Sequence, residues 1–257
     1  RTPRERLEPI FAAVAEPLAA LFRRLGDPAP DAPQQPLSVM ETIKRAATVT
    51  QGDPALLLAI ADKESRFQTA VQARTSSATG LFQFIDSTWL KVVREFGPKH
   101  GLDREAAAIR VDGEAHRVDD PTTLAQILAL RRDPWLSSIL AAEMLKRDRA
   151  RISRKIGRDL TEGEIYLCHF LGPVGAEAFL LAVQSKPDQS APALFPKPAK
   201  ANKAIFYASA KGKKKPAERT LADVRDNFER MMGARLERYR EIGRAPAATA
   251  YAQTEPR

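Results

Sequence analysis

The sequence predicts an all-α, or nearly all-α, fold. No segment of the main body alternates apolar and polar residues with a period of two, as a half-buried strand would. Apolar residues instead recur at helical spacing, and several stretches begin with helix-capping patterns. The fractions of hydrophobic residues (44%) and charged residues (28%) are those of an ordinary globular protein, which excludes wholesale disorder.

Residues 1–36 are expected to form an N-terminal helical extension and a linker. Apolar residues from Leu7 to Leu25 follow a heptad-like spacing, which Pro9 and Pro17 interrupt. This favours two or three short helices packed on a neighbour, and a coil that binds a protein partner is the alternative. Residues 27–36 hold four prolines and are typical of a semi-rigid linker.

The main body, residues 37–186, is expected to be one helical domain. Ser38-x-x-Glu41 is a capping box that predicts a helix through about Val49. Asp53 followed by Pro54 predicts the start of a second helix. Further helices are predicted at 86–96, 121–130, 134–151, 161–171 and 173–184, with Gly172 and Gly175 between the last two.

Residues 187–257 are predicted to form an irregular basic arm followed by a helix. Thr220-x-x-Asp223 caps that helix. The net charge of +9 is concentrated here, because residues 197–257 carry 15 basic and 7 acidic side chains while the rest of the chain is nearly neutral. The run Lys211–Lys215 has no interleaved aromatic residues, so we expect no nucleic-acid binding.

Composition narrows the chemistry further. A single cysteine, Cys168, excludes an internal disulfide and a cysteine-based zinc site. His100 and His116 show no metal-ligand spacing, so the sequence predicts no metal and no cofactor. No apolar run approaches the roughly 18 residues of a membrane span, so no transmembrane segment is expected.

Glu64 is the strongest candidate for a catalytic residue. It follows Ile60 by four residues and Leu57 by seven, so it shares the buried face of the second predicted helix. Apolar surroundings and the negative end of the helix dipole both favour the protonated form, which a general acid needs. A structural glutamate paired with an arginine is the alternative.

The segment after Glu64 resembles the soluble lytic transglycosylase (SLT) family, which shares the fold of goose-type lysozyme. The resemblance rests on Glu64-Ser65, on Phe67, and on Gly80-Leu81-Phe82-Gln83-Phe84 after a short polar loop, with Phe82 in place of the usual methionine. It implies that Glu64 is catalytic and that the loop supports it. The residues proposed to bind substrate or support the site in this stretch are Ser65, Thr75, Ser76, Ser77, Gly80, Phe82 and Gln83.

A second family motif, Ala-Tyr-Asn-Ala-Gly, corresponds here to residues 168–172. Aligning the glycines places His169 at the tyrosine of the motif and Phe170 at the asparagine, while Tyr166 lies one turn earlier. Either Tyr166 or His169 is therefore expected to contact Glu64. Asp133-Pro134 and the helix after it also resemble the family, so the resemblance covers about residues 37–185.

The resemblance implies a peptidoglycan lytic transglycosylase that cleaves the β-1,4 bond between N-acetylmuramic acid and N-acetylglucosamine without water. Asp62 points to another helix face and Asp86 is expected to cap the next helix, so a single carboxylate is predicted. The alternatives are a hydrolytic muramidase on the same fold and an inactive wall-binding scaffold.

The resemblance also implies a location and partners. We expect a periplasmic protein, or one exported to the bacterial cell wall with its signal peptide removed. Its partners would be glycan strands and an anionic wall polymer. A wall-associated protein could bind through the N-terminal helices or the basic C-terminal region.

Overall fold

The computed structural model describes residues 37–74, 76–208 and 216–245. The predicted N-terminal extension and linker, Thr75 and the run Lys211–Lys215 lie outside the described residues. Within the described part the chain is helical, and its strands form one two-stranded sheet. The predicted fold class is therefore confirmed.

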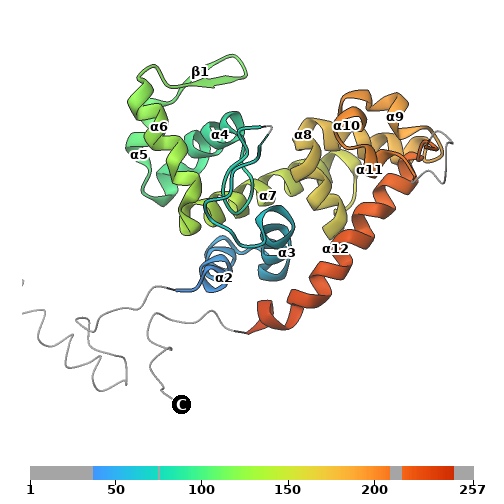
Figure 1. Cartoon of the computed structure of the whole chain (residues 1–257), viewed down its shortest axis with the longest axis horizontal. Helices are drawn as coiled ribbons and strands as arrows, with labels where there is room; N and C mark the ends of the chain where they lie inside the picture. The colour runs from blue at the N-terminus through green and yellow to red at the C-terminus, as the bar shows by residue number, and fades with distance from the viewer. Residues whose placement is uncertain (1–36, 75, 209–215, 246–257) are drawn as a thin grey trace, which may run out of the picture. The chain divides into compact units, whose positions relative to one another are not determined.

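Five helices form the centre of the fold (Figure 1). Helix α3 contacts α2 on one side and α12 on the other, while α7 contacts α2 and α8, and α12 also lies along α8. All five contribute to one hydrophobic core. Their bounds are α2 Val39–Thr50, α3 Pro54–Ser65, α7 Pro134–Ile156, α8 Glu162–Ser185 and α12 Leu221–Arg244.

Helix α3 lies in the middle of this core because it is apolar on every side. Asp53 caps it as predicted, since its side chain accepts a hydrogen bond from the Ala55 amide at 2.8 Å, and Pro54 occupies the first helical position. Leu58 and Ile60 are fully buried although they lie on different faces of the helix. Glu64 therefore projects from the end of a helix that packing holds on both sides.

Helix α8 consists of two helical segments separated by a break at Gly172. The predicted capping box is present at its start, where Thr161 and Glu164 exchange hydrogen bonds. Gly172 breaks the helical geometry with φ 71° and ψ 165°, and Pro173 begins the second piece. The predicted interruption is confirmed at Gly172, whereas Gly175 lies within the second piece.

A second group of elements packs beyond α7. These are α4 (Asp86–Phe96), the 3₁₀ helix η2 (Gly97–His100), α5 (Asp103–Ala108), the antiparallel strands β1 (Arg110–Asp112) and β2 (Ala115–Arg117), α6 (Pro121–Ala129) and the 3₁₀ helix η3 (Leu130–Arg132). Trp89 is fully buried in α4, and its indole nitrogen donates to the Ile127 carbonyl oxygen of α6 at 2.7 Å. This bond joins α4 to α6 and supports the segment that precedes α7.

The arm is more regular than predicted. It forms three short helices, α9 (Ala191–Leu194), α10 (Pro196–Ala201) and α11 (Lys203–Phe206). Proline in the first turn starts α9 and α10, and Pro196 also prevents α9 from continuing into α10. The expectation of an irregular arm is thus wrong for these residues.

The predicted final helix is confirmed as α12, with the Thr220–Asp223 capping box at its start. Leu221, Val224 and Phe228 of its apolar stripe are buried against the core. In Figure 1, α12 runs from the arm helices past α8 to α3.

One helix of the described part, α8, is long and apolar enough to cross a membrane by length and composition alone. The core helix of a globular domain passes the same test. Here α8 packs against α7 and α12 and is broken at Gly172, as a core helix can be. The absence of a transmembrane segment stays a prediction.

Candidate active site

A cleft of about 690 Å³ opens beside the end of α3. Its walls come from α3, the following loop, α7, α8 and the arm, so elements far apart in the sequence meet there. Its lining includes Lys63, Glu64, Ser76, Gln83, Ile85, Met144, Asp148, Tyr166, His169, Phe170, Gly172, Pro173 and Asn202. The cleft therefore unites Glu64 with both candidate partners from the second motif.

Glu64 is the last residue but one of α3. The chain then leaves the helix through two left-handed residues, Arg66 (φ 51°) and Phe67 (φ 62°). The Arg66 amide closes the helix by donating to the Asp62 carbonyl oxygen at 3.0 Å. The Glu64 side chain keeps 18% exposure, so it is shielded from bulk water but reachable from the cleft.

Tyr166 contacts Glu64 directly. Its hydroxyl donates to Glu64 Oε1 at 2.6 Å, the short distance of a bond to a charged acceptor. Burial raises the pKa of Tyr166, and the charge of Glu64 and their hydrogen bond raise it further. The phenol therefore stays neutral and remains a hydrogen-bond donor to Glu64 throughout the physiological pH range.

His169 lies in the same cleft but makes a longer contact. Its Nε2 is 3.9 Å from Glu64 Oε1, beyond the range of a hydrogen bond. The imidazole stacks on the ring of Tyr166 with 6.0 Å between ring centroids. Of the two alternatives that the sequence left open, Tyr166 makes the hydrogen bond to Glu64, whereas His169 lies beside Glu64 and stacks on Tyr166.

The end of α3 is held by α12. Asp62 forms ion pairs with Arg235 at 3.7 Å and Arg238 at 3.5 Å. The ring of Tyr239 packs edge-on against Phe67, with 5.8 Å between centroids. Thus α12 braces both the last turn of α3 and the residue that turns the chain toward the loop.

The loop after α3 folds tightly around Gly80. Gly80 has φ 80°, and a Cβ there would lie 2.2 Å from the carbonyl oxygen of Arg131. Only glycine permits this approach. Gln83 lines the cleft, and its Nε2 donates to the carbonyl oxygens of Val71 at 3.2 Å and Gly80 at 2.9 Å. The side-chain amide of Gln83, a residue proposed to bind substrate or support the site, therefore also stabilises the loop.

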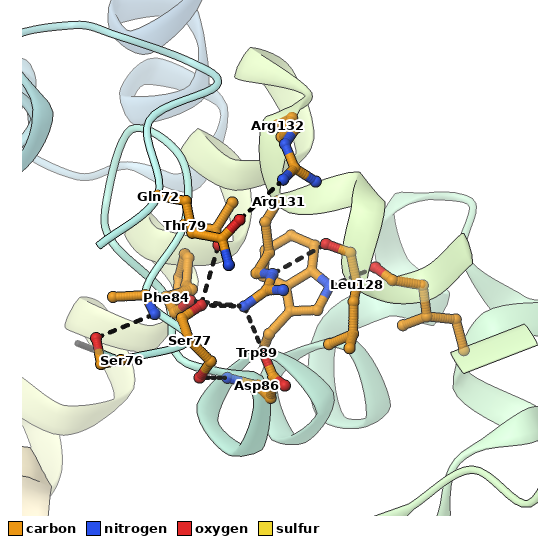
Figure 2. Close-up of polar contacts among 12 residues, drawn as sticks. Gln72, Ser76, Ser77, Thr79, Phe84, Asp86, Trp89, Leu128, Arg131 and Arg132 are labelled. Carbon is orange, nitrogen blue, oxygen red and sulfur yellow. Dashed lines mark hydrogen bonds and ion pairs between the residues drawn. The ribbon is translucent and has the colours of Figure 1, made fainter. Parts of the chain in front are cut away.

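Arg131 comes from η3, and its guanidinium reaches the loop and holds it through hydrogen bonds (Figure 2). Its Nη1 donates to the carbonyl oxygens of Ser77 at 2.8 Å and Phe84 at 3.0 Å. The same nitrogen pairs with Asp86 at 2.6 Å, and Nε donates to the Leu128 carbonyl oxygen at 2.9 Å. Arg131 is 6% exposed, so it is a buried cation whose partners are two loop carbonyl oxygens, one carbonyl oxygen of α6 and the Asp86 carboxylate.

Sequence reasoning missed Arg131 and misassigned Asp86. The N-cap of α4 is Ile85, and Asp86 is the first residue of the helix, so the expected capping role is wrong. Its carboxylate pairs with Arg131, and its amide donates to the Ser77 hydroxyl at 3.1 Å. Nothing in the sequence singles out Arg131 because its partners are mostly backbone carbonyl oxygens.

Two predicted site residues support the cleft from behind. The Ser65 hydroxyl donates back to the Ala61 carbonyl oxygen at 3.0 Å and is buried. Phe82 is fully buried in the hydrophobic core. Both stabilise the elements that carry the site, and neither belongs to the cleft lining.

Two of the remaining predicted site residues, Ser76 and Phe170, line the cleft. Ser76 lines the cleft, and its hydroxyl accepts a hydrogen bond from the Ala78 amide at 3.3 Å. Phe170 also lines the cleft and packs on Phe228 of α12 with 5.2 Å between ring centroids. Thr75 lies outside the described residues.

A second carboxylate that the sequence did not suggest, Asp148 of α7, lines the same cleft. Burial raises the pKa of Asp148, which the charge and the hydrogen bond of Arg147 partly offset. The Arg147 guanidinium holds this carboxylate at 2.8 Å. Nearby, burial raises the pKa of the Cys168 thiol to about 12, so the thiol is not ionised at neutral pH.

Across the described ranges, no group of three or more His, Cys, Asp or Glu side chains could hold a metal ion. Residues 41–107 match the family model described as the Transglycosylase SLT domain. The match contains Glu64, Gly80 and Gln83. It ends before α7 and α8, which supply Tyr166, His169 and the opposite wall of the cleft.

Proposed function

We propose that this chain is a peptidoglycan lytic transglycosylase of the soluble lytic transglycosylase (SLT) family, with Glu64 as its acid and base. At the level of the family, the SLT domain implies lytic-transglycosylase-type activity on peptidoglycan. The observation that carries the finer proposal is the Glu64 carboxyl group in a 690 Å³ cleft, with Tyr166 donating to one of its oxygens at 2.6 Å.

In the first step, protonated Glu64 gives its proton to the oxygen between N-acetylmuramic acid and N-acetylglucosamine. The C1–O bond breaks, and the substrate's acetamido group stabilises the positive charge that develops at C1. Glu64 then takes the proton of the muramoyl 6-hydroxyl, whose oxygen attacks C1. The product is a 1,6-anhydromuramoyl end, and no water is consumed.

Tyr166 gives the two oxygens of Glu64 different roles. Because Oε1 already accepts the hydrogen bond of the phenol, Oε2 remains to give the proton to the substrate and to take it back. The bond strengthens when Glu64 becomes negative, since hydrogen bonds to charged acceptors are stronger than neutral ones. Tyr166 therefore stabilises the carboxylate that forms as the leaving oxygen is protonated.

Hydrolysis is the second candidate, and one observation favours it. Asp148 lines the same cleft as Glu64 and would be the second carboxylate of a hydrolase. Its oxygen Oδ1 is bonded to Arg147, which argues for a structural role. The lytic mechanism is preferred because it requires only the one carboxyl group that Tyr166 orients.

Product analysis tests the proposal. Purified protein is incubated with peptidoglycan sacculi, and the released fragments are analysed by mass spectrometry. The lytic mechanism gives muramoyl ends lighter by one water molecule than the reducing ends that hydrolysis gives. Reducing ends would establish the muramidase, and binding without release would establish an inactive wall-binding scaffold.

The proposal also sets where the protein acts. Its substrate lies outside the cytoplasmic membrane, so we propose a periplasmic or wall-associated location. The excess positive charge of residues 197–257 supports attraction to an anionic wall polymer or a partner.

A further inference from the structure

The arm after α8 is fixed to the domain at several points. Phe195 packs on Phe179 of α8 with 5.2 Å between ring centroids, and Phe206 is fully buried. The Arg219 guanidinium donates to the carbonyl oxygens of Ala204 at 3.0 Å and Ile205 at 2.9 Å. These contacts hold the arm against α8 and the hydrophobic core.

One residue of the arm, Asn202, lines the catalytic cleft. It connects α10 to α11 and is partly buried. The lining residues that α8 contributes beyond Phe170 are Leu171, Gly172 and Pro173, at the break in that helix. These three carry no polar side-chain atom, so Asn202 adds side-chain polarity to the cleft from outside α8.

The local structure orients the Asn202 side chain. Its Nδ2 donates to the Pro198 carbonyl oxygen at 3.2 Å, which uses one of the two amide protons. An asparagine side chain has two N–H donors and a carbonyl oxygen, so one donor and the acceptor oxygen remain. A preoriented amide in a cleft is the kind of group that fixes how a polar ligand is placed.

We propose that Asn202 is a substrate-binding residue, and that its side-chain amide forms a hydrogen bond with a hydroxyl or acetamido group of the glycan. This proposal rests on the proposed function for the identity of the ligand. It extends the substrate site beyond the matched SLT region, because Asn202 lies in the arm and outside residues 41–107.

The test compares Asn202→Ala with Lys203→Ala, a neighbouring exposed residue that does not line the cleft. Both changes are made in full-length protein, alone and combined with Glu64→Gln, which separates binding from turnover. Binding to purified, peptide-free glycan strands is measured by titration calorimetry. For Asn202→Ala we expect about tenfold weaker binding and a raised KM with kcat nearly unchanged, which corresponds to one neutral hydrogen bond.

Lys203→Ala is expected to bind as tightly as the parent protein. Equal affinity of Asn202→Ala and the parent would overturn the inference, and so would a matching loss in Lys203→Ala. If thermal unfolding shows that Asn202→Ala loosens the arm, Arg219→Ala serves as the second variant, because it removes two hydrogen bonds to the arm and does not line the cleft. Retained binding in Arg219→Ala supports the contact of Asn202 with the glycan, whereas a loss equal to that of Asn202→Ala contradicts it. Failure of the parent protein to bind or cleave any glycan would instead refute the proposed function.

Discussion

Replacing Tyr166 with phenylalanine removes one hydrogen bond from Glu64 and keeps the ring in place. The Tyr166 ring lies 5.8 Å from that of Phe228 and 6.0 Å from that of His169, and phenylalanine preserves both contacts. Only the 2.6 Å bond to Oε1 is lost. Because the Glu64 side chain retains 18% exposure, water can reach its carboxylate, and we expect little change in folding stability.

The effect on catalysis follows from how the bond strengthens during the reaction. A hydrogen bond to a charged acceptor contributes about 1.5–3 kcal/mol, against about 1 kcal/mol for a neutral one. The difference of about 1–2 kcal/mol develops as Glu64 loses its proton, so kcat should decrease about five- to thirtyfold.

The assay is release of soluble muropeptides from sacculi, followed over a range of pH. Tyr239→Phe is the matched control, because it removes a phenol from α12 without touching Glu64. An unchanged kcat in Tyr166→Phe would refute the role given to this bond. A loss of the same size in Tyr239→Phe would show that the effect is not specific to Glu64.

Three further predictions concern the elements that support the cleft. Arg131→Met removes the donors to the loop carbonyl oxygens, so we expect a loss of about 3 kcal/mol in unfolding free energy in urea and a lower kcat/KM; unchanged values would contradict this role of Arg131. Gly80→Ala introduces a Cβ against the Arg131 carbonyl oxygen at positive φ, so we expect a loss of about 2–4 kcal/mol by the same measurement, whereas Gly233→Ala, in open space inside α12, should stabilise the protein by up to about 1 kcal/mol. Although burial opposes ionisation of Glu164, hydrogen bonds from Arg158 and Thr161 hold its pKa below the usual value. The ionised Glu164 therefore contributes fully to folding stability above about pH 5, and this contribution declines as the pH falls through the lowered pKa of the folded state. The stability difference between the parent protein and Glu164→Gln should therefore shrink between pH 7 and pH 3 in urea unfolding, and a constant difference would contradict this assignment.

Much of the helical framework could be predicted because its signals are local. Asp53-Pro54 and the capping boxes at Thr161 and Thr220 mark helix starts through residues that lie within one turn of each other. Helical spacing places Glu64 on the face that it shares with Leu57 and Ile60, and the structure shows it as the last residue but one of α3.

The partners of these residues could not be predicted, because they depend on contacts distant in sequence. The bond from Tyr166 to Glu64 joins residues 102 positions apart, and the motif alone favoured neither Tyr166 nor His169. Arg131 acts mainly on backbone oxygens, which leave no trace in residue identity. The arm helices depend on burial of Phe195 and Phe206 against the domain, which a proline-rich composition conceals.

The most direct test of the account is Glu64→Gln, a substitution that keeps the size of the side chain and removes its ability to give and take a proton. The measurement is the amount of 1,6-anhydromuropeptide released from purified sacculi, together with the helical circular dichroism spectrum. The account predicts that release disappears while the spectrum and the binding of sacculi are retained. Release at the rate of the parent protein would contradict the claim that Glu64 performs both proton transfers.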